Sequence, residues 1–383
     1  MNSFSLWKRI MGYLSPYRRW AAIAFIGIIG STSLAVAIPT ILRDVVDIGI
    51  ERSDRDYMLA AGLLVMVLGF FRGLTGFIYR FFGERLSHYA AYDLRNQVYD
   101  KVQNLAFSYH DQAQTGTLVT RAISDVDEIQ RYFAFGLIDG VNTSLLLIGV
   151  AAVMIRASPI LAVTALLPLI PLAFLSRKFA MRVHPIWKQI MERLQALGNH
   201  IQENSLGAEV VRAFNREEYE IEKFSKSNEE LYVDRVSLIQ DWATYLPMSM
   251  FIIAFSTALV LFVGGWMEQN GHGNVTVGLV VSFNAYVLLL AQPLRFLGFV
   301  IMLTTQAVSS AERVFEILDE PTAIQNKPDA IIPERIEGYV RMEGVKFAYD
   351  GVEKPVLCNI DVEAKPGEVI ALLGPTGSGK STL

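Results

Sequence analysis

A short stretch near the end of the sequence has the residue types and spacing that hold a phosphate group. Gly374 to Ser381 fits the pattern G-x-x-x-x-G-K-[ST] without a mismatch. The glycines permit a tight loop whose N–H groups point at phosphate oxygens, and a following helix adds the positive end of its dipole. We expect Lys380 to contact the β- and γ-phosphates and Ser381 to ligate Mg²⁺. The predicted nucleotide-binding residues are Gly374, Pro375, Thr376, Gly377, Ser378, Gly379, Lys380, Ser381 and Thr382.

The residues before this loop read as β-structure that would hold it in place. A β-rich run begins with Tyr339, Val340, Val345 and Phe347, Asp350-Gly351 marks a turn, and Val356 to Val362 has the composition of a second strand. Val369 to Leu373 is an apolar run short enough for a buried parallel strand, with a helix expected after the loop. The alternative for the glycine-rich motif, a flexible Gly-Ser loop, is the weaker reading because of this order of strand, loop and helix.

The composition points to a membrane protein. Of the 383 residues, 52% are hydrophobic and 19% are charged, which is too apolar for an ordinary soluble protein. The formal net charge of −4 gives no basic field, so no nucleic-acid partner is expected. The single cysteine, Cys358, excludes an intrachain disulfide.

Six regions are apolar over about 20 residues, the length that crosses a hydrocarbon core of about 30 Å. The first resembles a signal peptide at Ala35-Val36-Ala37, but its apolar run continues to Leu42, so a retained span is the better reading. The predicted spans are 20–42, 57–82, 132–155, 159–176, 242–267 and 275–303.

The N-terminal segment 1–19 sets the predicted topology. Apolar residues recur there at helical spacing, which suits a short helix in the membrane interface, although an ordinary basic flank is the alternative. Its four cations, Lys8, Arg9, Arg18 and Arg19, predict a cytosolic N-terminus. Six crossings then return the C-terminal segment to the cytosol.

Two long connections, 83–131 and 177–241, lie on the cytosolic side in this topology. They contain one proline, Pro185, so each can continue the adjacent spans as long helices. A turn is needed in each, and Gly116 and Gly207 lie near the two midpoints. The repeated order of span, long helix, tip, long helix and span indicates a lever that reaches into the cytosol.

The tip sequences carry a resemblance to a known family. ENSLGAEVVRAFNREEYEIEKF, from Glu203, resembles the second intracellular loop of ATP-binding cassette (ABC) exporters of the type IV fold. FSYHDQAQTGTLVTRAISDVDEI, from Phe107, is similar to the first loop but departs from it at His110 and Thr117. SSAERVFEILDEP, from Ser309, is similar to the family's exit from its membrane domain. The resemblance implies coupling helices that dock on nucleotide-binding domains, with contacts at His110, Asp111, Thr115, Gly116, Gly207, Arg212 and Phe214.

The resemblance also implies a mechanism. Two such half-transporters pair as a homodimer or heterodimer, bind ATP and Mg²⁺ between their cassettes, and export a small, amphipathic or hydrophobic substrate through the cell membrane. Tyr349 lies where the family places an aromatic that stacks on adenine, although alone it reads as a packed strand residue. An importer permease is disfavoured because membrane and nucleotide segments share one chain.

Ionisable residues within the spans are costly at membrane depth and are candidates for a translocation path. Arg72 and Arg80 lie in the second span, Asp139 in the third and Arg295 in the sixth. The alternative, which we weigh more heavily, is a structural pair of Arg72 or Arg80 with Asp139, or snorkelling of Arg80 and Arg295 to the interface.

The predicted fold is an all-α polytopic membrane domain of six transmembrane helices with long cytoplasmic extensions, followed by the incomplete start of an α/β P-loop nucleotide-binding domain. The expected parts are an interfacial helix (1–19), the membrane domain (20–318), a linker (319–337) and the partial nucleotide-binding domain (338–383). The residues up to Leu383 include no catalytic glutamate or switch histidine, so we expect no catalytic residues and no ATP hydrolysis from the chain as given. The alternative function is a non-catalytic truncated membrane partner, or inhibitor, that docks on the nucleotide-binding domains of another chain.

Overall fold

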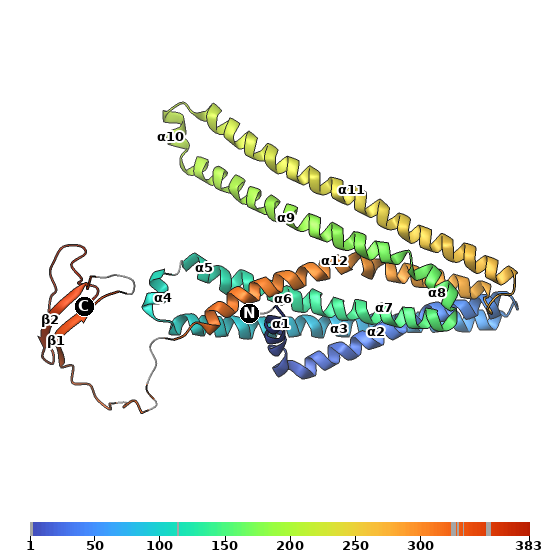
Figure 1. Ribbon diagram of the computed structural model, residues 1–383, viewed down its shortest axis with the longest axis horizontal. Helices are drawn as coiled ribbons and strands as arrows, with labels where there is room; N and C mark the ends of the chain where they lie inside the picture. The colour runs from blue at the N-terminus through green and yellow to red at the C-terminus, as the bar shows by residue number, and fades with distance from the viewer. Residues whose placement is uncertain (1–2, 113–114, 323–326, 328, 332, 350–353) are drawn as a thin grey trace. The chain divides into compact units, whose positions relative to one another are not determined.

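Long α-helices make up most of the chain. The computed structural model describes residues 3–383 except 113–114, 323–326, 328, 332 and 350–353. Contacts divide the chain into two units, which we call the helical unit (Met1–Arg95 with Ser124–Arg313) and the tail unit (Asn96–Ile123 with Val314–Leu383). In chain order (Figure 1), the elements are α1 (Ser3–Gly12), η1 (Ser15–Tyr17), α2 (Arg18–Asp44), η2 (Val45–Ile50), α3 (Arg55–Asn104), α4 (Phe107–Gln112), α5 (Thr115–Thr120), η3 (Arg121–Asp125), α6 (Val126–Arg131), η4 (Tyr132–Leu137), α7 (Ile138–Ala157), α8 (Pro159–Leu166), α9 (Leu169–Leu206), α10 (Ala208–Ala213), α11 (Glu217–Gln269), α12 (Val277–Asp319), β1 (Val340–Phe347) and β2 (Leu357–Ala364).

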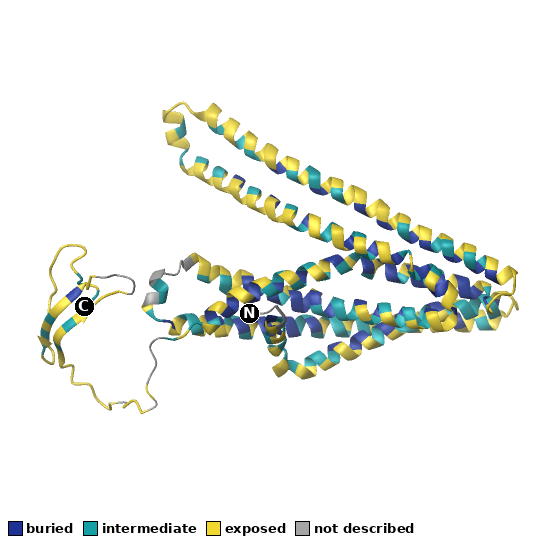
Figure 2. Cartoon of the chain, viewed as in Figure 1, coloured by how far each residue is buried: buried dark blue, intermediate teal, exposed yellow. Residues whose placement is uncertain are grey.

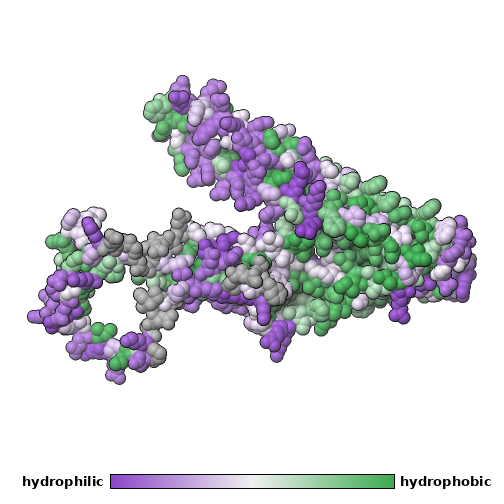
Figure 3. Space-filling view, viewed as in Figure 1, coloured by the Kyte–Doolittle hydropathy of each residue, from purple (hydrophilic) through white to green (hydrophobic). Residues whose placement is uncertain are grey.

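Six of these helical stretches are long and apolar enough to cross a membrane, which confirms the six predicted spans. The second span continues without interruption into its predicted extension, because α3 is a single helix of 50 residues. Pro185 lies inside α9 and does not end that helix. Figure 3 shows hydrophobic side chains gathered over one part of the helical unit, whereas the part of α9 and α11 near α10 is mostly hydrophilic. The stretches are Ser15–Ile50, Arg55–Asn104, Gly116–Ala157, Pro159–Leu206, Glu217–Gln269 and Val277–Asp319.

The largest apolar core of the helical unit joins α7, α8, α9, α11 and α12. On α12, Phe283, Val287 and Leu290 are fully buried at the spacing of one helix face. Small residues let the helices approach, as at Gly298, where an added Cβ would lie 2.5 Å from the carbonyl oxygen of Ser176. The core therefore fixes α12 against both α9 and α11.

The extensions of α9 and α11 pack as an antiparallel pair with a seam of seven-residue spacing. Val183, Ile190 and Leu197 of α9 and Leu231 and Leu238 of α11 are buried in one cluster. This period is that of a coiled coil, in which one stripe of each helix faces the other. Figure 2 shows that most other positions along the two helices are exposed. The pair therefore holds itself together outside the main core.

One junction between α2 and α12 caps the start of the sixth span. The Asp47 carboxylate, in η2, accepts a hydrogen bond from the Thr276 hydroxyl at 2.6 Å and from the Gly278 N–H at 2.8 Å. Such a cap satisfies a backbone donor that the first turn of a helix leaves free. Tyr286 adds a second link by donating to the carbonyl oxygen of Val36 at 2.9 Å. The first and last spans are thus joined by polar contacts as well as by packing.

The tail unit contains a two-stranded antiparallel sheet of β1 and β2, which confirms the first two predicted strands. Val340 lies opposite Ala364 and Phe347 opposite Leu357. Next to the sheet, Tyr339 donates a hydrogen bond to Glu363 at 3.0 Å. This bond raises the pKa of Tyr339, because the phenolate would lie beside a carboxylate. The predicted turn at Asp350-Gly351 lies outside the described residues.

One prediction about the tail unit is wrong. Val369 to Leu373 form no strand, and their ends are almost fully exposed, at 92% for Val369 and 95% for Leu373. A buried parallel strand needs neighbours on both edges and cover on both faces, and the described sheet consists of β1 and β2. The helix expected after the phosphate motif stays a prediction, because only Thr382 and Leu383 follow Ser381 in the sequence.

Candidate functional site

The predicted phosphate loop, 374–382, is a series of turns held by its own lysine. Lys380 Nζ donates to the carbonyl oxygens of Gly374 at 2.6 Å and Pro375 at 2.7 Å. Gly377 and Gly379 have φ of 84° and 86°, in the left-handed region that favours glycine. An added Cβ at Gly379 would lie 3.0 Å from a side-chain atom of Leu357. Glycine is therefore needed at these positions for the loop's path as well as for access to it.

Tyr349, predicted to stack on adenine, lies beside the end of this loop. Its hydroxyl oxygen is 3.1 Å from the Thr382 hydroxyl oxygen. Its ring packs edge-on against Phe347, with centroids 5.1 Å apart, and 41% of the residue is exposed. The structure thus brings an aromatic face and the phosphate loop together, although they are far apart in the sequence.

The donor set of the loop fits a nucleotide phosphate and its magnesium ion. Lys380 provides a cation, which here is bonded to the carbonyl oxygens of Gly374 and Pro375, and Ser381 is exposed and carries a hydroxyl oxygen. Phosphate binding needs N–H donors and a cation, and Mg²⁺ prefers oxygen ligands. Lys380 and the loop N–H groups would hold the phosphates, and Ser381 would hold the metal.

The first tip, in the tail unit, consists of α4 and α5. His110 Nε2 lies 3.1 Å from the carbonyl oxygen of Val102, which holds α4 against the end of α3. Phe107 is 84% exposed at the start of α4. Gly116 lies in the first turn of α5 with open space around it, and residues 113–114, just before this helix, lie outside the described residues. The side chains of Asp111 and Thr115 lie outside what the structure describes.

Two contacts at the first tip were not anticipated from the sequence. Arg121 forms an ion pair with Glu316, with Nη1 3.1 Å from Oε2. Lys101 donates to the Thr322 hydroxyl at 3.1 Å. Both tie the first tip to the exit of α12. Their partners lie some 200 positions away in the chain, and no local pattern could have indicated them.

The second tip, in the helical unit, is the short helix α10 between α9 and α11. Gly207 ends α9 with φ −96° and ψ 12°, which confirms the predicted turn at this glycine. Phe214 is 73% exposed, and Arg212 lies in the last turn of α10 and is also exposed. Leu206 and Val210 add exposed apolar surface that the sequence analysis did not single out. The second tip therefore carries several exposed apolar side chains close together in the sequence.

The ionisable residues within the spans separate into three environments. Arg80 pairs with Asp139, with Nη1 3.1 Å from Oδ1, and its guanidinium also lies 4.5 Å from the centre of the Phe135 ring. Arg72 is exposed on α3 and forms no ion pair among the described residues. Arg295 lines a cavity, and its buried Nε has no hydrogen-bond partner in the described part of the chain. The structure thus supports a structural role for Arg80 and Asp139.

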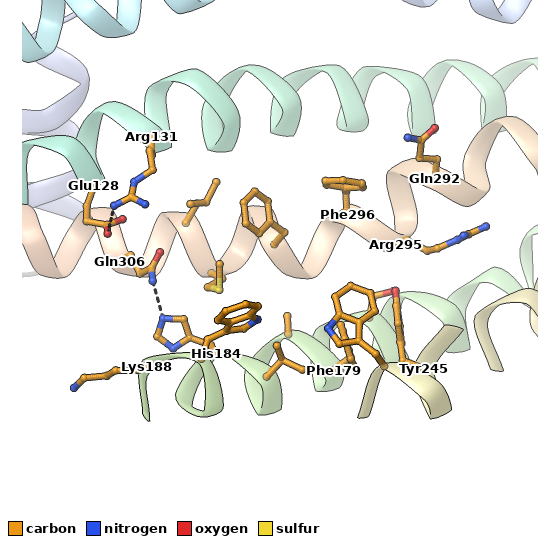
Figure 4. A pocket seen from close by; sticks show the side chains of 18 of the residues that line it. Glu128, Arg131, Phe179, His184, Lys188, Tyr245, Gln292, Arg295, Phe296 and Gln306 are labelled. Carbon is orange, nitrogen blue, oxygen red and sulfur yellow. Dashed lines mark hydrogen bonds and ion pairs between the residues drawn. The ribbon is translucent and has the colours of Figure 1, made fainter. Parts of the chain in front are cut away.

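The cavity that holds Arg295 lies between α6, α9, α11 and α12 and has a volume of 1340 Å³. Figure 4 shows Gln292 and Arg295 near one end and Glu128, Arg131, His184 and Gln306 near the other. Between them lie aromatic side chains, including Phe179 and Phe296. The cavity is therefore amphipathic, with polar groups at both ends of an aromatic wall.

Most polar groups of the cavity already have partners. Arg131 pairs with Glu128, and Arg313 pairs with buried Asp125. Gln306 Nε2 lies 2.6 Å from His184 Nε2, across α9 and α12. For Arg295, the buried Nε has no hydrogen-bond partner in the described part of the chain. The sequence indicated Arg295 because a charged residue lies within a predicted span. His184 and Gln306 lie outside the predicted spans, so hydropathy did not single them out.

Comparison with known proteins gives a consistent family. A profile of the ABC transporter transmembrane region matches residues 21–294. The ABC transporter ATP-binding protein YknU of Bacillus subtilis is 33% identical, over 98% of this chain and 64% of that protein. The putative multidrug export ATP-binding/permease protein YgaD of the same organism is 28% identical, over 98% and 66%. An ATP-dependent lipid A-core flippase of Chromobacterium violaceum is 25% identical, over 100% and 65%. The chain thus spans somewhat less than two thirds of the length of these relatives.

Proposed function

This chain belongs to the ABC transporter transmembrane region family, and on that basis we propose that it is one half of a dimeric, ATP-driven exporter of amphipathic molecules. The second half is another such chain, identical or related. The protein lies in the cell membrane, with its N-terminus and nucleotide-binding segment in the cytoplasm. Membrane lipid surrounds its spans, and ATP with Mg²⁺ binds at residues 374–382 and Tyr349.

The observation that carries this proposal is that the same two helices bear the second tip and line the cavity. Phe179 and Trp187 on α9 and Trp242 and Tyr245 on α11 face the cavity, and both helices continue to α10. The seam between α9 and α11 lets the pair move as one piece. A displacement of the tip is therefore passed to the cavity wall without a flexible joint.

The exposed apolar residues of the second tip supply the docking contact. Phe214 and Leu206 are 73% and 82% exposed, so burying them under a nucleotide-binding domain is favourable by about 1.5–3 kcal/mol each. Lys380 and Ser381 would hold MgATP, which would supply charge and contacts between two nucleotide-binding segments. Nucleotide binding would shift the cavity only if it favoured one arrangement of the protein over the other.

The cavity supports an amphipathic substrate. Aromatic and aliphatic walls with a few polar groups are typical of sites for drug-sized molecules, and such sites have volumes of about 300–1,000 Å³. At 1340 Å³ this cavity exceeds that range and would hold a bulky molecule. Arg295 provides a cation beside the aromatic wall, and its buried Nε has no hydrogen-bond partner among the described residues.

The test is ATP-dependent uptake of a fluorescent amphiphile into inside-out membrane vesicles that contain this chain within a full-length transporter. We expect Lys380→Ala to abolish uptake, because it removes the cation of the phosphate loop. Lys365→Ala changes an exposed lysine of the same unit outside the loop and is the matched control. Equal uptake by wild type and Lys380→Ala would refute the proposal.

A further inference from the structure

A second hollow in the helical unit lies between α7, α8, α9 and α12 and is distinct from the amphipathic cavity. We call it the α7–α12 groove, and its volume is 480 Å³. Its α9 wall is a stripe at helical spacing made of Leu169, Ala173 and Arg177. Among the described residues that line it, Arg177 alone is charged. The groove is thus an apolar channel with one cation.

The position of Arg177 places this cation at a membrane surface. The fourth span is predicted to end at residue 176, so Arg177 is the first residue beyond it. The side chain is exposed and forms no ion pair in the part of the chain that the structure describes. Its neighbour Lys178 is exposed as well. Two adjacent cations at the interface favour an anion there.

The length of the groove corresponds to one leaflet of a bilayer. From Leu166 to Arg177, and from Leu290 to Ile301 on α12, the lining residues extend about 16 Å at 1.5 Å per residue. Half of a hydrocarbon core of about 30 Å is about 15 Å. The groove therefore runs from the middle of the bilayer to the surface at which Arg177 lies.

The floor of the groove is rigid, whereas its rim is open. Leu169, Leu290 and Leu294 are 4%, 0% and 6% exposed and belong to the main core. Ile170 and Phe174 on the rim are 52% and 67% exposed. In a bilayer such a rim faces lipid, so the groove is accessible from the membrane. The amphipathic cavity, lined from the other side of α12, is a different space.

We propose that the α7–α12 groove binds one anionic glycerophospholipid of the adjacent leaflet. One acyl chain lies along Leu169, Ala173 and Leu294, and the anionic headgroup pairs with Arg177. A guanidinium recognises phosphate with two parallel hydrogen bonds, which fits an arginine better than a lysine at this end. A zwitterionic lipid is disfavoured because its ammonium group would lie beside Arg177 and Lys178. The proposal needs only that the chain spans a bilayer and does not depend on transport.

The experiment counts bound lipid by native mass spectrometry of the purified protein. The protein is supplied with equal amounts of phosphatidylglycerol and phosphatidylcholine of identical acyl chains. We expect wild type to retain phosphatidylglycerol preferentially. Arg177→Gln should weaken this binding about tenfold or more, as for hydrogen bonds between charged groups. Arg177→Lys should weaken it less, and the matched control Lys178→Gln should have little effect.

A second variant tests the groove itself. Ala173→Phe fills the channel between α9 and α12 and should remove the retained lipid even though Arg177 is unchanged. This variant also tests lipid binding in the groove if Arg177→Gln lowers the thermal stability of the protein. Equal retention of the two lipids by wild type, equal effects of Arg177→Gln and Lys178→Gln, or full retention by Ala173→Phe would each overturn the proposal.

Discussion

Arg80 of α3 and Asp139 of α7 form a two-pronged contact, with Arg80 Nη1 3.1 Å from Oδ1 and 3.2 Å from Oδ2 of Asp139. Glu84 lies 3.7 Å from Arg80 Nε, one turn further along α3. The two spans are thus joined by charge at a position where lipid or packed side chains surround them. Removing one partner leaves the other charge uncompensated.

We therefore expect Asp139→Asn to lower the free energy of unfolding by about 1–2 kcal/mol, since both side chains remain partly exposed. The measurement is thermal unfolding in detergent. A double-mutant cycle with Arg80→Gln isolates the pair. If the effects of the two substitutions simply add, the contact contributes nothing specific.

A second prediction concerns the junction between α2 and α12. Gly278→Ala would place a Cβ 2.3 Å from the carbonyl oxygen of Arg43 and 2.5 Å from Asp47 Oδ1. Overpacking of this kind costs about 1–3 kcal/mol of stability, and here it also disturbs the cap of α12. Gly265→Ala on α11 has no atom within 4 Å of the new Cβ and is the control. Matched unfolding temperatures for the two variants would contradict the clash.

The third prediction is about the amphipathic cavity. Arg295→Gln should reduce transport of an anionic amphiphile by about tenfold relative to a cationic one with the same apolar body, because it removes a cation from the cavity. Arg72→Gln removes an arginine from another span outside the cavity and should leave this ratio unchanged. The measurement is uptake of the two probes into the same vesicles. A ratio that shifts equally in both variants would point to a general effect of charge.

The fourth prediction addresses the second tip. Phe214→Ala should reduce transport several-fold while leaving the unfolding temperature unchanged, because the side chain is 73% exposed and packs on little within its own unit. Tyr219→Ala, at a position that is 56% exposed on nearby α11, serves as the comparison. Transport and thermal unfolding are measured on the same preparations. Loss of stability in Phe214→Ala would show that the residue packs internally.

The sequence predicted the parts of this structure that depend on local pattern. Hydropathy located the spans, Gly207 marked its turn, and composition indicated β1 and β2. The sequence prediction failed for Val369 to Leu373, because a parallel strand depends on neighbouring strands as well as on its own composition.

Contacts between residues far apart in the sequence could not be predicted from the sequence either. The sequence left open whether Arg72 or Arg80 pairs with Asp139, whether Arg80 snorkels to the interface, or whether these residues line a translocation path, and the contact between α3 and α7 shows the Arg80 pair. His184 of α9 and Gln306 of α12 come within hydrogen-bonding distance because the two helices lie next to each other at these positions. The α7–α12 groove likewise arises from stripes on several helices, and none of these stripes differs from an ordinary core face when it is read alone.

The seam that joins Val183, Ile190 and Leu197 to α11 repeats every seven residues. The distance between the membrane and the second tip can therefore change only in fixed steps. One extra residue in α9 would rotate everything beyond it by about 100° and turn the apolar stripe away from its partner. Seven extra residues in each helix would keep the stripes facing and extend the pair by about 10 Å. Changes in the distance between membrane and tip should therefore be tolerated in whole heptads, and insertions of other lengths should separate the two helices.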